Sequence, residues 1–130
     1  MATRTDVTPL SNLKASPRSV AEAINAAIKP LYNDNQLEEC ARRCYTADVK
    51  MWTDQKQLLS GTDELMKYLK EAFKTGAKIG DVVIEEAMNV GDKHIIAKCK
   101  CDFGCEYHYM SLYRFDDDGQ WRIEWDVDYM

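Results

Sequence analysis

The sequence of 130 residues lacks the features that mark fibrous, membrane-spanning and secreted chains. Three prolines and six glycines are too few for a collagen-like or low-complexity chain. No apolar run approaches the roughly 20 residues of a transmembrane helix, and the first residues contain no apolar segment typical of a secretion signal. We therefore expect a cytoplasmic protein whose five cysteines are thiols rather than a disulfide framework.

An excess of basic residues is missing as well. The chain has 17 Lys and Arg against 22 Asp and Glu, which gives a net charge of −5. Nucleic acids and anionic membranes bind surfaces on which Lys and Arg cluster, whereas here the basic residues are scattered. We expect neither partner. The hydrophobic content of 45% is enough for one globular domain of ordinary size.

The start of the chain predicts a tail followed by a helix. Residues 1–15 are polar and unpatterned, so we expect a flexible tail there and a single domain over residues 16–130. Ser16-Pro17 is one helix-start signal, and the capping box from Ser19 to Glu22 is another. Pro30 should end or kink this first helix because proline has no backbone N–H to donate.

Helical spacing continues to residue 76. Apolar residues from 37 to 45 form the stripe of a short second helix, and residues 49–53 are typical of a first strand. Ser60 begins a third helix, and Gly76 stands where a glycine commonly ends one.

After Gly76 the apolar residues recur at every second position, as in β-strands. The predicted strands cover residues 79–90, 95–103, 105–115 and 121–129. The sequence thus predicts an α+β domain, with three N-terminal helices packed on a curved, mostly antiparallel sheet.

The loop lengths predict which side chains share a face of the sheet. A three-residue loop at 102–104 and a five-residue loop at 116–120 place the odd-numbered residues of the last three strands together on the inner face. The predicted cross-strand neighbours are Cys101 with Cys105, Cys99 with Tyr107, and Ser111 with Trp125. On this register Asp126 lies on the outer face.

The predicted inner face is aromatic but interrupted by small residues, so it can line a cavity or form a packed core. The residues expected to line this pocket are Trp52, Cys99, Tyr107, Tyr109 and Trp125. On the outer face Met110 and Leu112 are candidates for contact with a second copy of the chain, so we expect a homodimer formed through the sheet.

Five short segments carry a resemblance to a known family. They are Asn-Asp-Asn-Gln-Leu at 33–37, Cys-Tyr-Thr-Ala-Asp at 44–48, Ser-Gly-Thr-Asp-Glu-Leu at 60–65, Asp-Gly-Gln-Trp-Arg-Ile at 118–123 and Trp-Asp-Val at 125–127. In this order and spacing they resemble the cystatin-like cone fold of nuclear-transport-factor-like, SnoaL-like and ketosteroid-isomerase-like proteins. The resemblance covers residues 17–129. It implies a cone-shaped fold but no particular activity, because the fold hosts enzymes, ligand binders and association modules.

The resemblance also implies candidate catalytic residues. Ketosteroid-isomerase-like enzymes use a tyrosine on the first helix, an aspartate late in the first strand and a protonated aspartate on a later strand. Here the first position falls near Ile28, the second near Thr53 or Asp54, and the third has no clear counterpart. Asp126 aligns with the terminal-strand aspartate of SnoaL-like proteins. The candidates are therefore Asp54 and Asp126, without a complete catalytic set.

A metal site is a weaker interpretation of the same region. Cys99, Cys101, Cys105 and His108 supply ligand types that suit zinc, but their spacing differs from the Cys-x-x-Cys of a zinc knuckle. A disulfide between Cys101 and Cys105 is an alternative in an oxidising environment. We expect no metal and no cofactor.

Three functions remain as hypotheses. The leading one is a homodimeric cone-fold domain that binds a small apolar or aromatic molecule between sheet and helices. The first alternative is a SnoaL-like isomerase or cyclase that uses a pocket carboxylate as acid or base. The second is a protein-association module without a ligand. Whether the protein is an enzyme stays open.

Overall fold

The computed structural model describes residues 9–129, which form a short 3-10 turn, three helices and six strands. The turn is η1 (Pro9–Ser11), and the helices are α1 (Pro17–Asn33), α2 (Leu37–Cys44) and α3 (Gly61–Lys74). The strands are β1 (Tyr45–Trp52), β2 (Leu58–Ser60), β3 (Val82–Asn89), β4 (His94–Asp102), β5 (Glu106–Phe115) and β6 (Trp121–Asp128).

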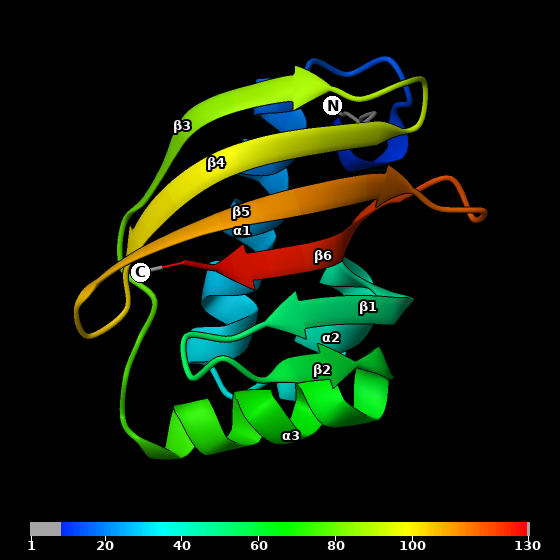
Figure 1. Cartoon of the computed structure of the whole chain (residues 1–130). Coiled ribbons are helices and arrows are strands. Elements are labelled where there is room, and N and C mark those ends of the chain that lie inside the picture. The colour runs from blue at the N-terminus through cyan, green and yellow to red at the C-terminus, as the bar shows by residue number, and fades with distance from the viewer. Residues whose placement is uncertain (1–8, 130) are drawn as a thin grey trace, which may run out of the picture.

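All six strands lie in one curved sheet in the order β2-β1-β6-β5-β4-β3. Only β1 and β6 run parallel, and the other neighbours are antiparallel. Helices α1 and α2 lie behind this sheet, and α3 runs along its β2 edge (Figure 1). The predicted α+β class is confirmed. Of the helices described, none is long and apolar enough to cross a membrane.

The packed chain begins earlier than predicted. Of the expected tail at residues 1–15, residues 1–8 lie outside the described residues. Residues 9–15 pack on the domain, because the indole N–H of Trp121 donates a hydrogen bond of 2.9 Å to the carbonyl of Asn12.

Helix α1 begins at the first of its two predicted start signals and continues past its predicted end. Its N-cap is Ser16, whose hydroxyl accepts a hydrogen bond from the backbone N–H of Ser19, so the capping box predicted at Ser19 does not start the helix. Pro30 does not end it either, and the helix continues to Asn33. The buried side chain of Tyr32 stabilises the last turn and compensates for the loss of the backbone hydrogen bond that Pro30 cannot donate.

The junction of α2 and β1 also differs from the prediction. Helix α2 ends at Cys44, and Tyr45 is the first residue of the strand that we expected only over 49–53. The three-residue strand β2 was not predicted. Helix α3 begins after its N-cap Ser60 as predicted, and Gly76 has the positive φ of +84° typical of the residue that follows a helix.

The β4–β5 hairpin is shifted by two residues from the predicted register. Cys101 lies opposite Tyr107 and Cys99 opposite Tyr109, whereas the prediction placed each partner two residues earlier. The connecting residues are 103–105. Because the shift is even, the odd-numbered residues of both strands still share the inner face, as predicted.

The β5–β6 hairpin begins as predicted and then changes register. The loop is 116–120, and the pairs nearest it follow the expected register. The pairs on either side of the change are Tyr113 with Ile123 and Leu112 with Trp125. Glu124 is therefore an extra residue in β6, which is the definition of a β-bulge.

The bulge reverses the faces of the last part of β6. Asp126 lies opposite Ser111 and is buried on the inner face, and Asp128 follows it on the same side. Trp125 and Val127 occupy the outer face. The prediction that Trp125 points inward and Asp126 outward is wrong, because strict alternation cannot anticipate an inserted residue.

Ion pairs on the outer face stabilise the bulge. The Glu124 carboxylate lies 2.9 Å from Nη1 of Arg114 and 3.2 Å from Nε2 of His94. The same guanidinium contacts Asp116 at 3.1 Å and Asp48 at 3.2 Å. Strand β6 is thus tied to β1, β4, β5 and the turn before it at the point where its register changes.

Candidate functional site

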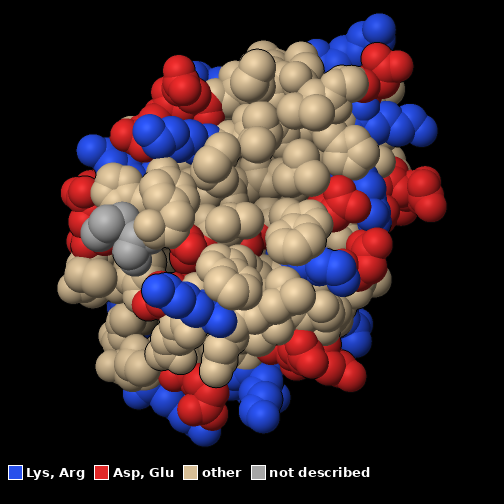
Figure 2. All heavy atoms as spheres, in the orientation of Figure 1, with Lys and Arg blue, Asp and Glu red and all other residues tan. Residues whose placement is uncertain are grey.

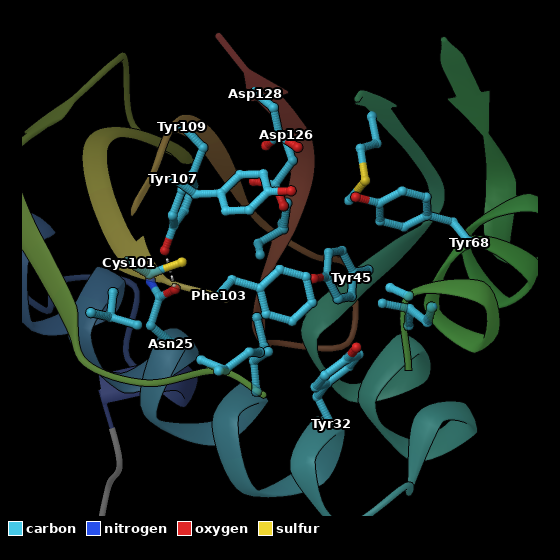
Figure 3. Close-up of a pocket in the computed structure, with 17 residues that line it drawn as sticks. Asn25, Tyr32, Tyr45, Tyr68, Cys101, Phe103, Tyr107, Tyr109, Asp126 and Asp128 are labelled. Carbon is cyan, nitrogen blue, oxygen red and sulfur yellow. Dashed lines mark hydrogen bonds between the residues drawn. The ribbon is translucent and has the colours of Figure 1, made fainter. Parts of the chain in front are cut away.

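A cavity of about 120 Å³ lies between the inner face of the sheet and helices α1 and α3. Most of its lining is apolar. Its lining residues with side-chain hydroxyl, amide or carboxyl groups are Asn25, Tyr32, Tyr45, Tyr68, Tyr107, Tyr109, Asp126 and Asp128. Figure 3 shows them converging on one space from α1, β1, α3, β5 and β6.

Asp126 is the more deeply buried acid of this cavity, with 8% of its surface exposed. Burial raises the pKa of its carboxyl to about 8, and the charge of Asp128 adds to the rise, whereas a hydrogen bond donated by the Ser111 hydroxyl opposes it. At neutral pH the carboxyl is therefore mostly protonated and can donate a hydrogen bond.

Asp128 and Asp54 lie nearer to solvent. Burial raises the pKa of Asp128 to about 6, and the charge of Asp54 contributes to the rise. Asp54, which we predicted as a general base, is exposed in the turn after β1 and accepts a hydrogen bond of 3.0 Å from the Tyr107 hydroxyl. The cavity thus has one carboxyl at its floor, one half-buried and one at its mouth.

Two polar side chains at the α1 wall are already paired with each other. The Tyr109 hydroxyl donates a hydrogen bond of 2.8 Å to Oδ1 of Asn25. The Asn25 amide in turn donates to the carbonyl of Ala21 at 2.8 Å. These bonds fix the orientation of the Tyr109 ring.

Tyr32 has no such partner. Only 2% of its surface is exposed, and its hydroxyl makes no hydrogen bond with any described residue. Its ring packs edge-to-face on Phe103 at 5.4 Å, and Phe103 packs in the same way on Tyr107 at 5.7 Å. An unpaired buried hydroxyl costs about 1–3 kcal/mol, which a hydrogen-bonding molecule in the cavity would remove.

Two further hydroxyls point into the same space (Figure 3). Burial, with the nearby charge of Asp126, raises the pKa of Tyr45 well above its usual value. Burial and the charge of Asp128 likewise raise the pKa of Tyr68. Both phenols therefore stay protonated at physiological pH and can donate hydrogen bonds.

The structure brings together only some of the predicted site residues. Tyr107 and Tyr109 are lining residues of the cavity. Cys99 is fully buried beneath it and is not a lining residue. Trp52, which is 39% exposed, and Trp125 lie on the outer face of the sheet.

Tyr32, Tyr45 and Tyr68 are lining residues that the sequence did not reveal. Tyr32 follows Pro30, where we expected the helix to end, and the other two stood in apolar helical stripes that we interpreted as core. The signal that identifies all three is a phenol hydroxyl within an otherwise apolar face, because a buried hydroxyl needs a partner.

The four residues considered for zinc do not converge. Cys99 and Cys101 lie on the inner face, and Cys105 is exposed in the turn. His108 lies on the outer face, where its Nε2 is 2.8 Å from Glu106. Within residues 9–129 no group of three His, Cys, Asp or Glu side chains is arranged to hold a metal ion.

Replacing Asp126 by Asn should weaken the dependence of stability on pH. The folded-state pKa of about 8 lies above the unfolded value of about 3.9, so between these values the folded chain keeps a proton that the unfolded chain releases. The stabilisation is complete below about pH 4 and is lost as the pH rises through about 8.

Urea denaturation of the original chain and the Asn variant at about pH 5 and pH 8 measures this difference. The variant should lose about 3–4 kcal/mol less stability between these pH values. Asp92→Asn, in an exposed turn, is the control. Equal losses in the original chain and Asp126→Asn would show that the Asp126 pKa is not raised.

Comparisons with known proteins identify the fold and no more. No protein-family model matches the chain, and no curated protein matches it. Among solved structures, an uncharacterised protein with a cystatin-like fold from Caulobacter vibrioides has a TM-score of 0.73 at 15% identity, over 86% of this chain and 87% of that chain.

Two further solved structures are similar to this chain in fold. An NTF-2-like protein of unknown function from Shewanella oneidensis has a TM-score of 0.72 at 12% identity, over 85% of this chain and 97% of that chain. A ketosteroid isomerase-like protein from Erwinia carotovora atroseptica has a TM-score of 0.70 at 17% identity, over 85% of this chain and 92% of that chain. The chain therefore has the cystatin-like fold of these structures.

Proposed function

We propose that this cone-fold domain binds one small molecule in the cavity between sheet and helices. The observation that carries the proposal is the Tyr32 hydroxyl, which is buried, lines the cavity and has no partner among the described residues. Native proteins pair nearly all of their buried polar atoms. A polar atom of a bound molecule would satisfy this one.

The size and lining of the cavity support a ligand of about one ring. Its volume of about 120 Å³ is close to that of an engineered apolar cavity of about 150 Å³ that binds benzene. The edge-to-face rings of Tyr32, Phe103 and Tyr107 offer the contacts that an aromatic or alicyclic molecule needs.

Phenol is a suitable probe, because it combines one ring with a hydroxyl that can accept a hydrogen bond from Tyr32. Ala72→Leu, at a lining residue of α3, should fill part of the cavity and weaken phenol binding at least tenfold in an NMR titration. Ala26→Leu, on the exposed side of α1, is the matched control and should bind phenol as the original chain does.

Equal phenol affinity in the Ala72 and Ala26 variants would place the binding site elsewhere. If the original chain bound no phenol, the ligand-binding proposal would be contradicted and the association-module hypothesis would be favoured.

The placement of β6 favours a second candidate, acid–base catalysis of SnoaL-like isomerase or cyclase type. Two carboxyls of one cavity have pKa values raised to different extents, about 8 for Asp126 and about 6 for Asp128. Such a pair can supply an acid and a base at the same pH. In this proposal Asp128 removes a proton and Asp126 donates one, and Asp54 at the mouth is an alternative base.

Exchange of the α-protons of 2-cyclohexenone in deuterated water tests this second candidate without knowledge of the natural substrate. The chain should accelerate exchange over buffer, and Asp128→Asn should reduce the acceleration about 100-fold. Asp54→Asn measures the contribution of the alternative base, and Asp92→Asn is the control. No acceleration by the original chain would rule out this chemistry on ring ketones of this size.

We further propose that the protein is a homodimer formed through the outer face of the sheet. No described element covers this face, and its middle is largely uncharged, with Lys, Arg, Asp and Glu side chains mostly around the rim (Figure 2). Its apolar residues include Trp52, Met110, Leu112, Trp125 and Val127. A self-complementary apolar patch of this kind is typical of two-fold dimer contacts.

Leu112→Glu should convert the dimer to a monomer, because it would place two buried carboxylates near the two-fold axis. Sedimentation velocity at about 10 μM measures the outcome. Leu13→Glu, an exposed apolar position before α1, should remain dimeric. A monomeric original chain, or a dimeric Leu112→Glu variant, would overturn the proposal.

A further inference from the structure

Within residues 9–129, the acidic side chains at the cavity have no basic side chain beside them. Asp126 and Asp128 belong to the lining, and Asp54 lies at the mouth, bonded to the lining residue Tyr107. Among the described residues that line the cavity there is no Lys, Arg or His. Two inward-facing carboxyls thus have no basic side chain beside them in the cavity, although buried acids in proteins are normally paired or neutralised.

Three basic residues near the cavity have other partners. Arg114 is bound to Glu124 and Asp116 on the outer face. Arg122 contacts Asp118 at 2.7 Å in the β5–β6 turn. Lys78 donates to the carbonyl of Asn33. None of these three cations belongs to the cavity lining, so a positive charge inside it would have to come from a ligand.

The aromatic walls of the cavity suit a cation as well as a neutral ring. Tyr32, Phe103 and Tyr107 pack edge-to-face at interplanar angles of 68° and 62°, so their faces point in different directions. The negative faces of aromatic rings attract organic cations, and rings set at angles around one ammonium group form the aromatic cage that recognises it.

We propose that the cavity binds a small organic ammonium ion, with Asp126 and Asp128 as its counter-ions and the rings of Tyr32, Phe103 and Tyr107 around it. This inference rests on the proposed ligand-binding function and specifies the chemical class of the ligand. The buried Tyr32 hydroxyl pairs with a polar atom carried by the same ligand. The cavity volume of about 120 Å³ limits the buried part to one ring or one trimethylammonium group.

Binding of such a cation is coupled to release of a proton. An ammonium ion favours the charged form of a neighbouring carboxyl, so it lowers the pKa of Asp126 from about 8 and displaces its proton at neutral pH. The other titratable groups that interact with Asp126 are phenols, thiols and one acid, from β1, α3, β4, β5 and β6. They are Tyr45, Tyr68, Cys99, Cys101, Tyr109, Tyr113 and Asp128. None of them becomes positively charged at low pH.

Choline and 3,3-dimethylbutan-1-ol make a matched pair of probes, because they have nearly the same shape and differ in the charge of one atom. Calorimetric titration should show choline binding at least tenfold more tightly than the alcohol at about pH 8.5. Choline affinity should fall at least tenfold from about pH 8.5 to pH 6, while the affinity for the alcohol changes little. The nitrogen of choline has no proton, so any proton released on binding comes from the protein.

Variants of the cavity carboxyls test whether these groups cause the pH dependence of choline binding. Asp126→Asn should lower choline affinity about tenfold, remove most of its pH dependence and leave the affinity for the alcohol unchanged. Asp128→Asn is a second test on a less buried carboxyl, in case the first variant does not fold. Asp92→Asn, in an exposed turn, should bind both probes as the original chain does.

The outcomes separate this inference from the proposed function. If the alcohol binds as tightly as choline at every pH, the ammonium inference is overturned while the ligand-binding function stands. If choline binds but Asp126→Asn and Asp128→Asn both bind it unchanged, the cation lies elsewhere and the inference is again overturned. If choline, the alcohol and phenol all fail to bind, both proposals fail.

Discussion

The ion pair between Glu124 and Arg114 stabilises the β6 bulge, on which the rest of the site depends. Glu124 is the extra residue of the β6 bulge, and Arg114 and His94 fix its carboxylate on the outer face. Without the bulge, strict alternation would turn the apolar residues that follow into the cavity and the aspartates outward. One inserted residue therefore decides whether the cavity is purely aromatic or acidic.

The β6 residues after the bulge bury an acid and turn apolar side chains to the outer face. Turning Asp126 inward buries a carboxyl, which would cost several kcal/mol if it stayed charged and alone. The raised pKa and the hydrogen bond from Ser111 reduce that cost, because the group is held mostly as the neutral acid at neutral pH. In return Trp125 and Val127 join the apolar outer face, next to Lys50 and Trp52 of the parallel strand β1. The cavity and the proposed dimer surface thus depend on the same register.

The sequence predicted the fold well because its signals were local and repeated. Three helical stripes, the change to period two after Gly76 and the five-residue loop at 116–120 sufficed for the α+β class and for the register beside that loop. The bulge was beyond prediction, since its residues after Ile123 fit regular alternation equally well. Alternation identifies the inner face only when the outer face is polar, and here both faces of β6 carry large apolar side chains.

The same ambiguity affected the candidate site. The inward positions of Tyr107 and Tyr109 could be predicted, because the loop lengths place odd-numbered residues of β5 on the inner face. The inward position of Asp126 depends on the bulge, and that of Tyr32 depends on a helix that continues past Pro30. Pairwise patterns along the chain do not report which residues from α1, α3 and β6 meet in space. The site combines elements that are far apart in sequence, so only the fold reveals its chemistry.

A cavity of this composition is an unfavourable way to build a core. Apolar side chains of similar volume in place of Asp126 and Tyr32 would remove a buried acid and an unpaired hydroxyl, each of which costs stability. Sequences that depart from the locally stable choice do so mainly at functional sites. Dimerisation through the outer face needs none of these inward groups. The cavity therefore argues for a bound molecule in addition to, rather than instead of, an association surface.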